Sequence, residues 1–218
     1  MTRNMMIGLI AAGVIIVGGG AAYMLTREDD SAPAGSSQEA GDASAASFNP
    51  TSTEGLEFKA TITTQKDGQT MTATLEHDDQ NRSRYVSNLG GQQTEVIYTN
   101  DAYYTCQAGG TCIKFPISQS ANSGFDPSAY NYDQSELAGF SDRSYKGKQD
   151  CPSGTCDVWE VTAGGFTSTL YIDSRTKRIT QVEGNIGGAS SKIVYDYTDV
   201  TITVPANAQE INVPGAAQ

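Results

Sequence analysis

The chain is poor in histidine, tryptophan and basic residues. It has 218 residues but one His and one Trp, so acid–base chemistry that depends on imidazole has a single candidate, His77. Its 14 Lys and Arg are outnumbered by 25 Asp and Glu, and the formal net charge is −11. Binding to nucleic acid or docking on anionic lipid headgroups needs clustered basic side chains. The composition argues against both kinds of partner.

Helix-forming runs and catalytic motifs are also missing. The chain has no long run of Ala, Leu, Glu and Lys, whereas Gly, Ser, Thr, Asn and Asp are abundant, which is typical of a mainly β protein with many turns. No GxSxG or SxxK nucleophile motif is present, and the stretch DDQNR lacks the ligand spacing of a calcium loop. We therefore predict no catalytic residue, no metal and no cofactor, and expect that the protein is not an enzyme.

The single histidine lies in an acidic stretch. His77 is flanked by Glu76, Asp78 and Asp79, a composition that suggests a metal or acid–base site. Successive side chains of a β-strand point to opposite faces, so these groups cannot all converge on one ligand. The pattern favours a solvated hairpin corner over a functional site.

The N-terminal segment is predicted to be a membrane anchor. Met5 to Leu25 contains no charged residue, and at ~1.5 Å per residue a helix of this length just crosses the ~30 Å hydrocarbon core. Arg3 precedes it and acidic residues follow, which predicts a single-pass helix (domain 1–25) with a cytoplasmic N-terminus and an extracytoplasmic remainder. The alternative is a cleaved signal peptide, with small residues at Gly20–Ala22 as the cleavage site.

Residues 26–47 are predicted to be a disordered linker. They contain no aromatic and no large apolar side chain, and cannot bury enough surface to offset their ordering entropy. The folded domain is expected over 48–213, followed by a disordered tail at 214–218.

Strand patterns recur from Phe48 onward. Apolar and polar residues alternate over short runs that are separated by turn residues, as in half-buried antiparallel strands. The runs are 57–64, 70–77, 82–88, 94–100, 102–106, 111–116, 144–148 and 157–163, and three more lie within 166–211. Asp67-Gly68 predicts a hairpin, and Asp126-Pro127 predicts a short helix over 127–137 with Gly139 beyond its end.

The four cysteines form two close pairs. Cys106 and Cys112 bracket one glycine-containing turn, and Cys151 and Cys156 bracket another. Opposed positions in a hairpin reach the Cα separation of a disulfide, and an extracytoplasmic location favours oxidation. We predict the disulfides Cys106–Cys112 and Cys151–Cys156; a zinc site built from all four thiolates is the alternative.

The strands share an apolar face that needs to be covered. A single long sheet buries such a face by curling around itself or by packing a helix against it. This leaves either a filled barrel core or a half-open sheet around a cavity. The residues predicted to line that hydrophobic cavity are Phe58, Ile62, Met71, Leu75, Tyr98, Phe115, Trp159, Val161, Leu170 and Ile172.

Two stretches, LYIDSRTKRITQVEG (170–184) and IVYDYTDVTITVPANAQEI (193–211), follow the early hairpins in a characteristic order. This order, over about Phe58–Val213, resembles that of the LolA-like family, which comprises outer-membrane lipoprotein-sorting carriers and their lipid-binding relatives. The resemblance implies a mainly β (α+β) fold, a curved antiparallel half-open β-barrel with short helices as a lid. It also implies a hydrophobic cavity for acyl chains.

These observations lead to one preferred function and one alternative. The preferred hypothesis is a membrane-tethered extracytoplasmic domain that binds a lipid or lipidated ligand without catalysis, because apolar burial alone holds an acyl chain. The alternative is a structural or protein-interaction module of the cell envelope with a fully packed β-barrel core. The sequence identifies no protein partner for it.

Overall fold

The computed structural model describes residues 47–89, 91–107, 111–118, 125–186 and 188–210. The predicted anchor Met5–Leu25, all but the last residue of the linker, and the predicted tail lie outside these residues. Within the described ranges, no helix has the length and apolar character needed to cross a membrane.

The described residues form a mainly β structure. In chain order the strands are β1 (Phe58–Lys66), β2 (Gln69–His77), β3 (Ser83–Leu89), β4 (Gln92–Tyr98), β5 (Ala102–Gln107), β6 (Cys112–Pro116), β7 (Ser141–Cys151), β8 (Gly154–Ala163), β9 (Phe166–Asp173), β10 (Ile179–Ile186), β11 (Ala189–Asp196) and β12 (Gln209–Glu210). The 3₁₀ helix η4 (Pro127–Tyr130) and the helix α1 (Gln134–Gly139) lie between β6 and β7. The predicted mainly β class is confirmed.

The backbone conformations of the turn residues determine where the hairpins form. Asp67 and Gly68 have φ values of 51° and 76°, the left-handed conformations of the hairpin turn that their sequence predicts. Lys177 closes the turn between β9 and β10 with a φ of 60°. In that turn the Asp173 carboxylate accepts hydrogen bonds from the backbone N–H groups of Arg175 (3.0 Å) and Thr176 (2.6 Å).

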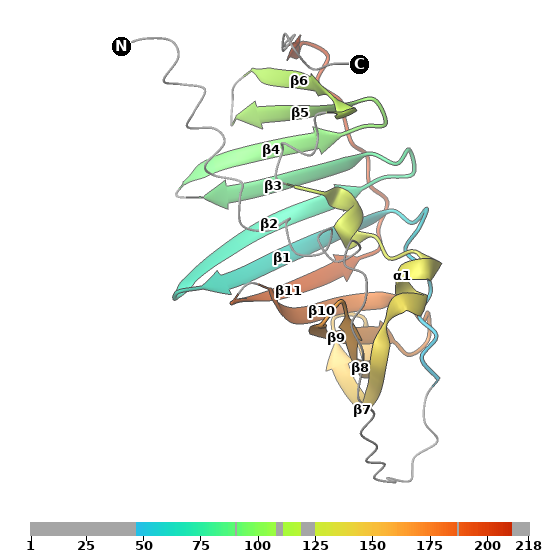
Figure 1. The fold of residues 1–218 in the computed structure, drawn as a ribbon. Coiled ribbons are helices and arrows are strands. Elements are labelled where there is room, and N and C mark those ends of the chain that lie inside the picture. The colour runs from blue at the N-terminus through green and yellow to red at the C-terminus, as the bar shows by residue number, and fades with distance from the viewer. Residues whose placement is uncertain (1–46, 90, 108–110, 119–124, 187, 211–218) are drawn as a thin grey trace.

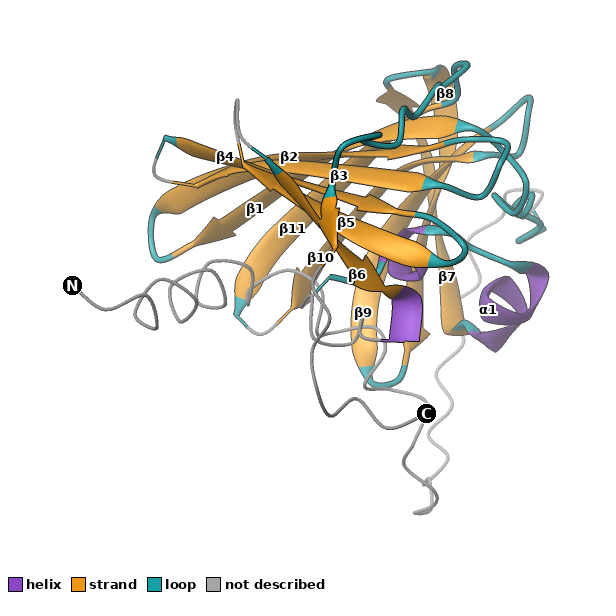
Figure 2. Cartoon of the chain, turned by 90° about the horizontal axis from the view of Figure 1, so that it is seen from above, coloured by secondary structure: helices purple, strands orange, loops and turns teal. Residues whose placement is uncertain are grey.

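All of these strands belong to one open, curved sheet (Figures 1 and 2). Their spatial order is β12-β6-β5-β4-β3-β2-β1-β11-β10-β9-β8-β7, and neighbours are antiparallel except β12, which pairs in parallel with β6. The two ends of the sheet do not pair with each other, so it stays half open as the family resemblance implied. Strand β1 lies in the middle and pairs with β2 on one side and β11 on the other.

The concave face of the sheet carries the hydrophobic core. In β1, Phe58, Ala60 and Ile62 are buried, and the side chains between them are exposed. Ile62 lies opposite Ile193 of β11, and the same row continues to Leu170. The 2.0-residue period therefore places one apolar side of each strand on the concave face.

The mid-chain segment contains two short helices, where the sequence predicted one over 127–137. Asp126 caps η4 by accepting the Ser128 N–H at 3.0 Å, and Asp133 caps α1 by accepting the Glu136 N–H at 2.8 Å. The helix breaks between them because the N–H and C=O of Tyr132 are bound by residues before β1. Gly139, expected beyond the helix, is its last residue. We call residues 125–140 the cover.

Both predicted disulfides are present. Cys106 and Cys112 face each other across β5 and β6 with Cα atoms 4.2 Å apart, and Cys151 and Cys156 are joined in the β7–β8 hairpin with Cα atoms 5.9 Å apart. Because all four cysteines are bonded, the zinc hypothesis is wrong.

The chain after β11 leaves the sheet, although the sequence predicted a strand run extending to residue 211. Strand β11 ends at Asp196, opposite Lys59 near the start of β1, so the pairing partners on both sides run out at this point. Residues 197–208, which we call the strap, pack Ile202 against Ile97, Ala102 and Tyr104, on the side of β4 and β5 away from the concave face. The strap ends in β12, which pairs with the edge of β6.

We expect Ile202→Ala to lower the free energy of unfolding by about 2–4 kcal/mol, because its side chain is 1% exposed and leaves a cavity when truncated. Urea unfolding of the purified protein measures this change. Thr203→Ala, at the exposed neighbouring position, is the matched control and should change stability by less than about 0.5 kcal/mol. Equal effects of the two substitutions would contradict the role of the strap.

Candidate functional site

The residues predicted to line a cavity all lie on the concave face. Eight of them are at most 7% exposed and belong to one core: Phe58, Ile62, Leu75, Tyr98, Trp159, Val161, Leu170 and Ile172. Phe115 is partly exposed and packs against the same core. Met71 lies outside the core, opposite Thr64 near the hairpin end of β2.

Aromatic rings cross the concave face from β6 to β7. Ring centroids of neighbours are 4.1 to 6.4 Å apart, for example 4.9 Å between Tyr103 and Phe115 and 5.1 Å between Tyr145 and Trp159. Such pairs add about 0.5–1.5 kcal/mol each beyond their buried area. We call aromatic layer the rings of Phe48, Phe58, Tyr85, Tyr98, Tyr103, Phe115, Phe125, Tyr130, Tyr132, Phe140, Tyr145, Trp159, Tyr195 and Tyr197.

The cover supplies part of this layer, and the sequence did not reveal it. Phe125 stacks on Tyr85 at 4.1 Å, and Leu137 is 4% exposed. The hydroxyl of Tyr98 donates to the Phe125 carbonyl oxygen at 2.8 Å, and the hydroxyl of Tyr195 donates to the Tyr130 carbonyl oxygen at 3.1 Å. Burial raises the pKa of Tyr195 well above its usual value, so this phenol keeps the proton that it donates.

Residues 47–57, which we call the arm, fasten the cover. Thr53 is fully buried, and its N–H donates to the Tyr132 carbonyl oxygen at 2.9 Å. Its hydroxyl donates to Asn131 Oδ1 at 2.5 Å and accepts the Tyr132 N–H at 2.7 Å. Earlier in the arm, the Thr51 N–H donates to the Lys177 carbonyl oxygen at 2.8 Å. The arm therefore ties the cover to the turn between β9 and β10.

Arg143 holds the other end of the cover. Its guanidinium donates to the carbonyl oxygens of Leu137 (3.2 Å), Ala138 (2.8 Å) and Phe140 (2.8 Å), which lie at the C-terminal end of α1 and just beyond it. A cation placed there also complements the helix dipole. The same guanidinium lies 4.6 Å from the ring centre of Phe48 in the arm. Arm, cover and β7 therefore meet at one side chain.

Beyond the cover, the concave face continues toward the hairpin ends as a row of small and hydroxyl side chains. The register places Thr64 beside Ser191, then Gly184, Ser168 and Val161 across five adjacent strands. A Cβ atom on Gly184 would meet the Ser168 hydroxyl at 3.0 Å, so this position is tightly packed. We call these residues, with Met71, the hydroxyl row; it contains no charged side chain.

The opposite, convex face carries the charges. Glu76 pairs with Lys59 (3.5 Å) and Arg84 (3.1 Å), and Arg84 pairs with Glu95 (2.7 Å), forming a chain across four strands. Charged side chains thus gather on the convex face, but Asp157 lies on the concave side opposite Ile172, where it pairs with Lys177 (3.3 Å) and accepts the Tyr145 hydroxyl (3.2 Å). A neutral or apolar ligand fits the concave face better than an ionic one, because a buried unpaired charge is costly.

His77 is part of the core, so its interpretation as a solvated corner is wrong. It is 7% exposed, stacks on Phe58 at 5.4 Å and lies 3.0 Å from the Ser83 hydroxyl. The neighbouring Asp78 is also buried, because its carboxylate accepts hydrogen bonds within the turn to β3 and pairs with Arg82. Within the described ranges, no three His, Cys, Asp or Glu side chains are placed to hold a metal ion.

A polar hollow of about 380 Å³ lies outside the predicted site, between the hairpins β1–β2 and β10–β11. Its lining residues are all exposed: Gln65, Lys66, Asp67, Gly68, Thr70, Asn185, Gly188 and Ser190. It contains none of the residues that the apolar pattern selected.

Neither a protein-family model nor a curated protein sequence matches the chain. Among solved structures it is similar to LprF from Mycobacterium bovis, with a TM-score of 0.50 and 14% identity, over 72% of this chain and 91% of that chain. It is also similar to the Mycobacterium tuberculosis lipoprotein LppX (TM-score 0.49, 12% identity, 70% and 92% covered). A LolA superfamily protein from Nitrosomonas europaea matches with a TM-score of 0.29 and 10% identity (67% and 87% covered).

At 14% identity, the likeness to LprF shows a shared fold and nothing about activity or ligand. The chain therefore shares the fold of LprF, and its open, curved antiparallel sheet agrees with the architecture that the sequence resemblance implied. What this fold does in this chain has to be argued from its own concave face.

We expect the free energy of unfolding to fall as the pH drops from about 7 to about 5.5. Burial lowers the pKa of His77 below 6.5, with Asp78 opposing the shift. As the pH falls, His77 of the unfolded chain therefore takes up a proton before His77 of the folded chain does. The stability that neutral His77 contributes is fully present above its unfolded pKa and is lost as the pH falls through its folded pKa. Urea unfolding at a series of pH values measures the slope. His77→Phe keeps a ring against Phe58 and should reduce the slope of unfolding free energy against pH. An unchanged slope would refute the assignment of this pH dependence to His77.

Proposed function

We propose that this domain binds a lipid or lipidated ligand on its concave face, between the sheet and the cover and along the adjoining hydroxyl row, without catalysis. One observation carries the proposal: a mainly apolar face that spans the sheet is covered, among the described residues, by a short segment with only ten helical residues, in η4 and α1. Nine of the ten residues predicted from the sequence lie in or against the core beneath it.

The energetics fit an acyl chain. Burying ten methylene groups contributes on the order of 8 kcal/mol, which corresponds to micromolar affinity before any cost. The ligand must displace some of the contacts between the cover and the aromatic layer, so part of this energy is offset. No charged side chain lies in the hydroxyl row to repel an apolar chain or to compete for it.

The cellular location of the folded domain is part of the same proposal. The uncharged segment Met5–Leu25 would hold the protein in the cell membrane as a single-pass anchor with a cytoplasmic N-terminus. The linker would place the folded domain outside the cytoplasm. Two disulfides in a small β domain support an oxidising compartment.

The alternative function, a structural or protein-interaction module, is supported by a different observation. The rings of the aromatic layer contact each other and the cover closely, and eight predicted lining residues are at most 7% exposed. A core that stays packed in this way needs no ligand, and a protein partner would then bind elsewhere on the domain. The two functions differ in whether the cover opens.

We expect bromine-labelled fatty acids to quench the fluorescence of Trp159, the single tryptophan, because its ring lies in the aromatic layer and bromine quenches on contact. Ser191→Phe fills the hydroxyl row and should weaken binding about ten-fold, a loss of about 1.4 kcal/mol. Ser190→Phe adds the same ring at the exposed neighbouring position and should leave binding unchanged.

Mass spectrometry of the purified domain is the complementary measurement, because a co-purified lipid would identify the ligand. Absence of bound lipid together with no quenching of Trp159 would overturn lipid binding and favour the packed interaction module. Equal weakening by Ser191→Phe and Ser190→Phe would place the ligand away from the concave face.

A further inference from the structure

We propose that the Cys151–Cys156 disulfide is a site of thiol–disulfide exchange with a dithiol reductant, and that its reduction loosens the arm and the cover. The exchange step stands on the surroundings of the two sulfur atoms. Its consequence for a bound ligand rests on the proposed function, whereas its consequence for the arm does not.

The two sulfur atoms lie in different environments. Cys151 is partly exposed at the end of the edge strand β7, whereas Cys156 is 0% exposed. An external thiolate can therefore approach Cys151 Sγ only. In the other disulfide, Cys112 is likewise partly exposed and Cys106 is 5% exposed, so exposure alone does not separate the two disulfides. The difference between them lies in the groups around the buried sulfur atom of Cys156.

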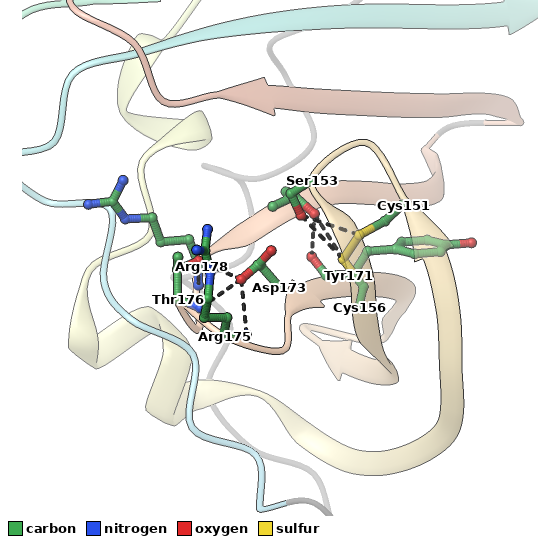
Figure 3. The surroundings of a disulfide bond; sticks show 9 residues. Cys151, Ser153, Cys156, Tyr171, Asp173, Arg175, Thr176 and Arg178 are labelled. Atoms are coloured by element: carbon green, nitrogen blue, oxygen red, sulfur yellow. Dashed lines mark hydrogen bonds between the residues drawn. A yellow bond between two sulfur atoms is a disulfide. The ribbon is translucent and has the colours of Figure 1, made fainter.

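Hydroxyl groups surround the sulfur that would leave. Cys156 Sγ lies 3.2 Å from the Thr180 hydroxyl. It also lies 3.9 Å from the Ser153 hydroxyl, which is itself 3.4 Å from Cys151 Sγ (Figure 3). The Thr180 hydroxyl also lies 3.3 Å from the Tyr171 carbonyl oxygen, so its proton can turn from that oxygen to a thiolate on Cys156. Donors of this kind stabilise the leaving thiolate and speed the exchange.

The bonds, electrons and protons of this exchange balance when a dithiol is the reductant. One thiolate of the dithiol attacks Cys151 Sγ and forms a mixed disulfide, while the Cys151–Cys156 bond breaks and its electron pair goes to Cys156 Sγ. The second thiol of the same molecule then attacks its own sulfur in the mixed disulfide and releases Cys151 as a thiolate. The dithiol is oxidised to a disulfide, and the protein takes up two electrons and, from solvent, two protons.

A chain of hydrogen bonds connects this hairpin to the cover. The carbonyl oxygen of Thr155, inside the disulfide loop, accepts the Ser174 N–H at 3.0 Å. Ser174 belongs to the turn held by Asp173, which Figure 3 shows beside the disulfide hairpin. The same turn accepts the Thr51 N–H at 2.8 Å through Lys177, and Thr53 of the arm binds the cover.

The Asp173 turn is held by several hydrogen bonds, which makes it a suitable link. Burial alone would raise the pKa of the Asp173 carboxyl, but hydrogen bonds from Thr176, Ser153 and Arg175 lower it to about 2. Ser153 lies between the two cysteines in the chain, so the disulfide loop contributes directly to holding this carboxylate. Opening the disulfide removes the covalent closure of this hairpin and leaves only the β7–β8 and β8–β9 backbone pairing to hold Ser153 and Thr155 against the turn.

The test uses the full chain in detergent micelles and dithiothreitol as the dithiol, with each disulfide followed by thiol alkylation and peptide mass spectrometry. Cys151–Cys156 should be reduced about ten-fold faster than Cys106–Cys112 or more. Thr180→Val removes the hydroxyl beside Cys156 and should slow the reduction about three-fold or more. Equal rates for the two disulfides, or resistance of both to the dithiol, would overturn the exchange site.

Hydrogen exchange tests the link to the cover in the same samples. Selective reduction should speed exchange of the Thr53 and Tyr132 amides about ten-fold, while amides in β3 and β4 keep their rates. Cys151→Ser with Cys156→Ser should reproduce this effect, and Cys106→Ser with Cys112→Ser should not. If the first double variant does not fold, hydrogen exchange of the reduced native chain alone decides whether the disulfide is linked to the cover. Unchanged Thr53 and Tyr132 exchange would refute the link, whether or not the protein binds lipid.

Discussion

An open β-sheet can bury its apolar face only if another part of the chain lies across it. In this domain the segments that do so are the cover and the arm, and their fastening points are few: the buried Thr53, Arg143 and the hydroxyls of Tyr98 and Tyr195. The concave core depends on these contacts, because the two ends of the sheet never meet. The same contacts control access to the core, so stability and ligand entry share one set of side chains.

The sequence predicted the strands and the shared face well, because both follow from local alternation. Phe58, Ile62 and Leu170 were placed on the apolar face on that basis, as residues lining a cavity, and the structure buries them in the core. Phe125 and Tyr130 were missed because the cover has no period that marks a buried side. Tertiary contacts also broke the predicted helix: Tyr132 binds Thr53, a partner that is distant in sequence and that no local pattern reveals.

The burial of His77 and Asp78 could not be predicted from the sequence. The acidic stretch around His77 looked solvated, yet His77 and Asp78 both lie inside. The ring of His77 stacks on Phe58 as a neutral group, and Asp78 is buried because Arg82 and two backbone N–H groups satisfy its oxygens. The hydrogen bonds within the tight turn and the ion pair with Arg82 together allow the burial of Asp78.

The central position of β1 determines when the domain can fold. Strands β1 to β6 form one meander of neighbours, but β1 also pairs with β11, where Ile62 meets Ile193. Closing that pair requires nearly the whole domain to have been synthesised, and long-range pairing of this kind is slow. Until then, the aromatic side of the β1–β6 meander is exposed to solvent. Such a partly folded state is prone to aggregation, and a chaperone would shield it. The order of the strands thus makes folding late and cooperative.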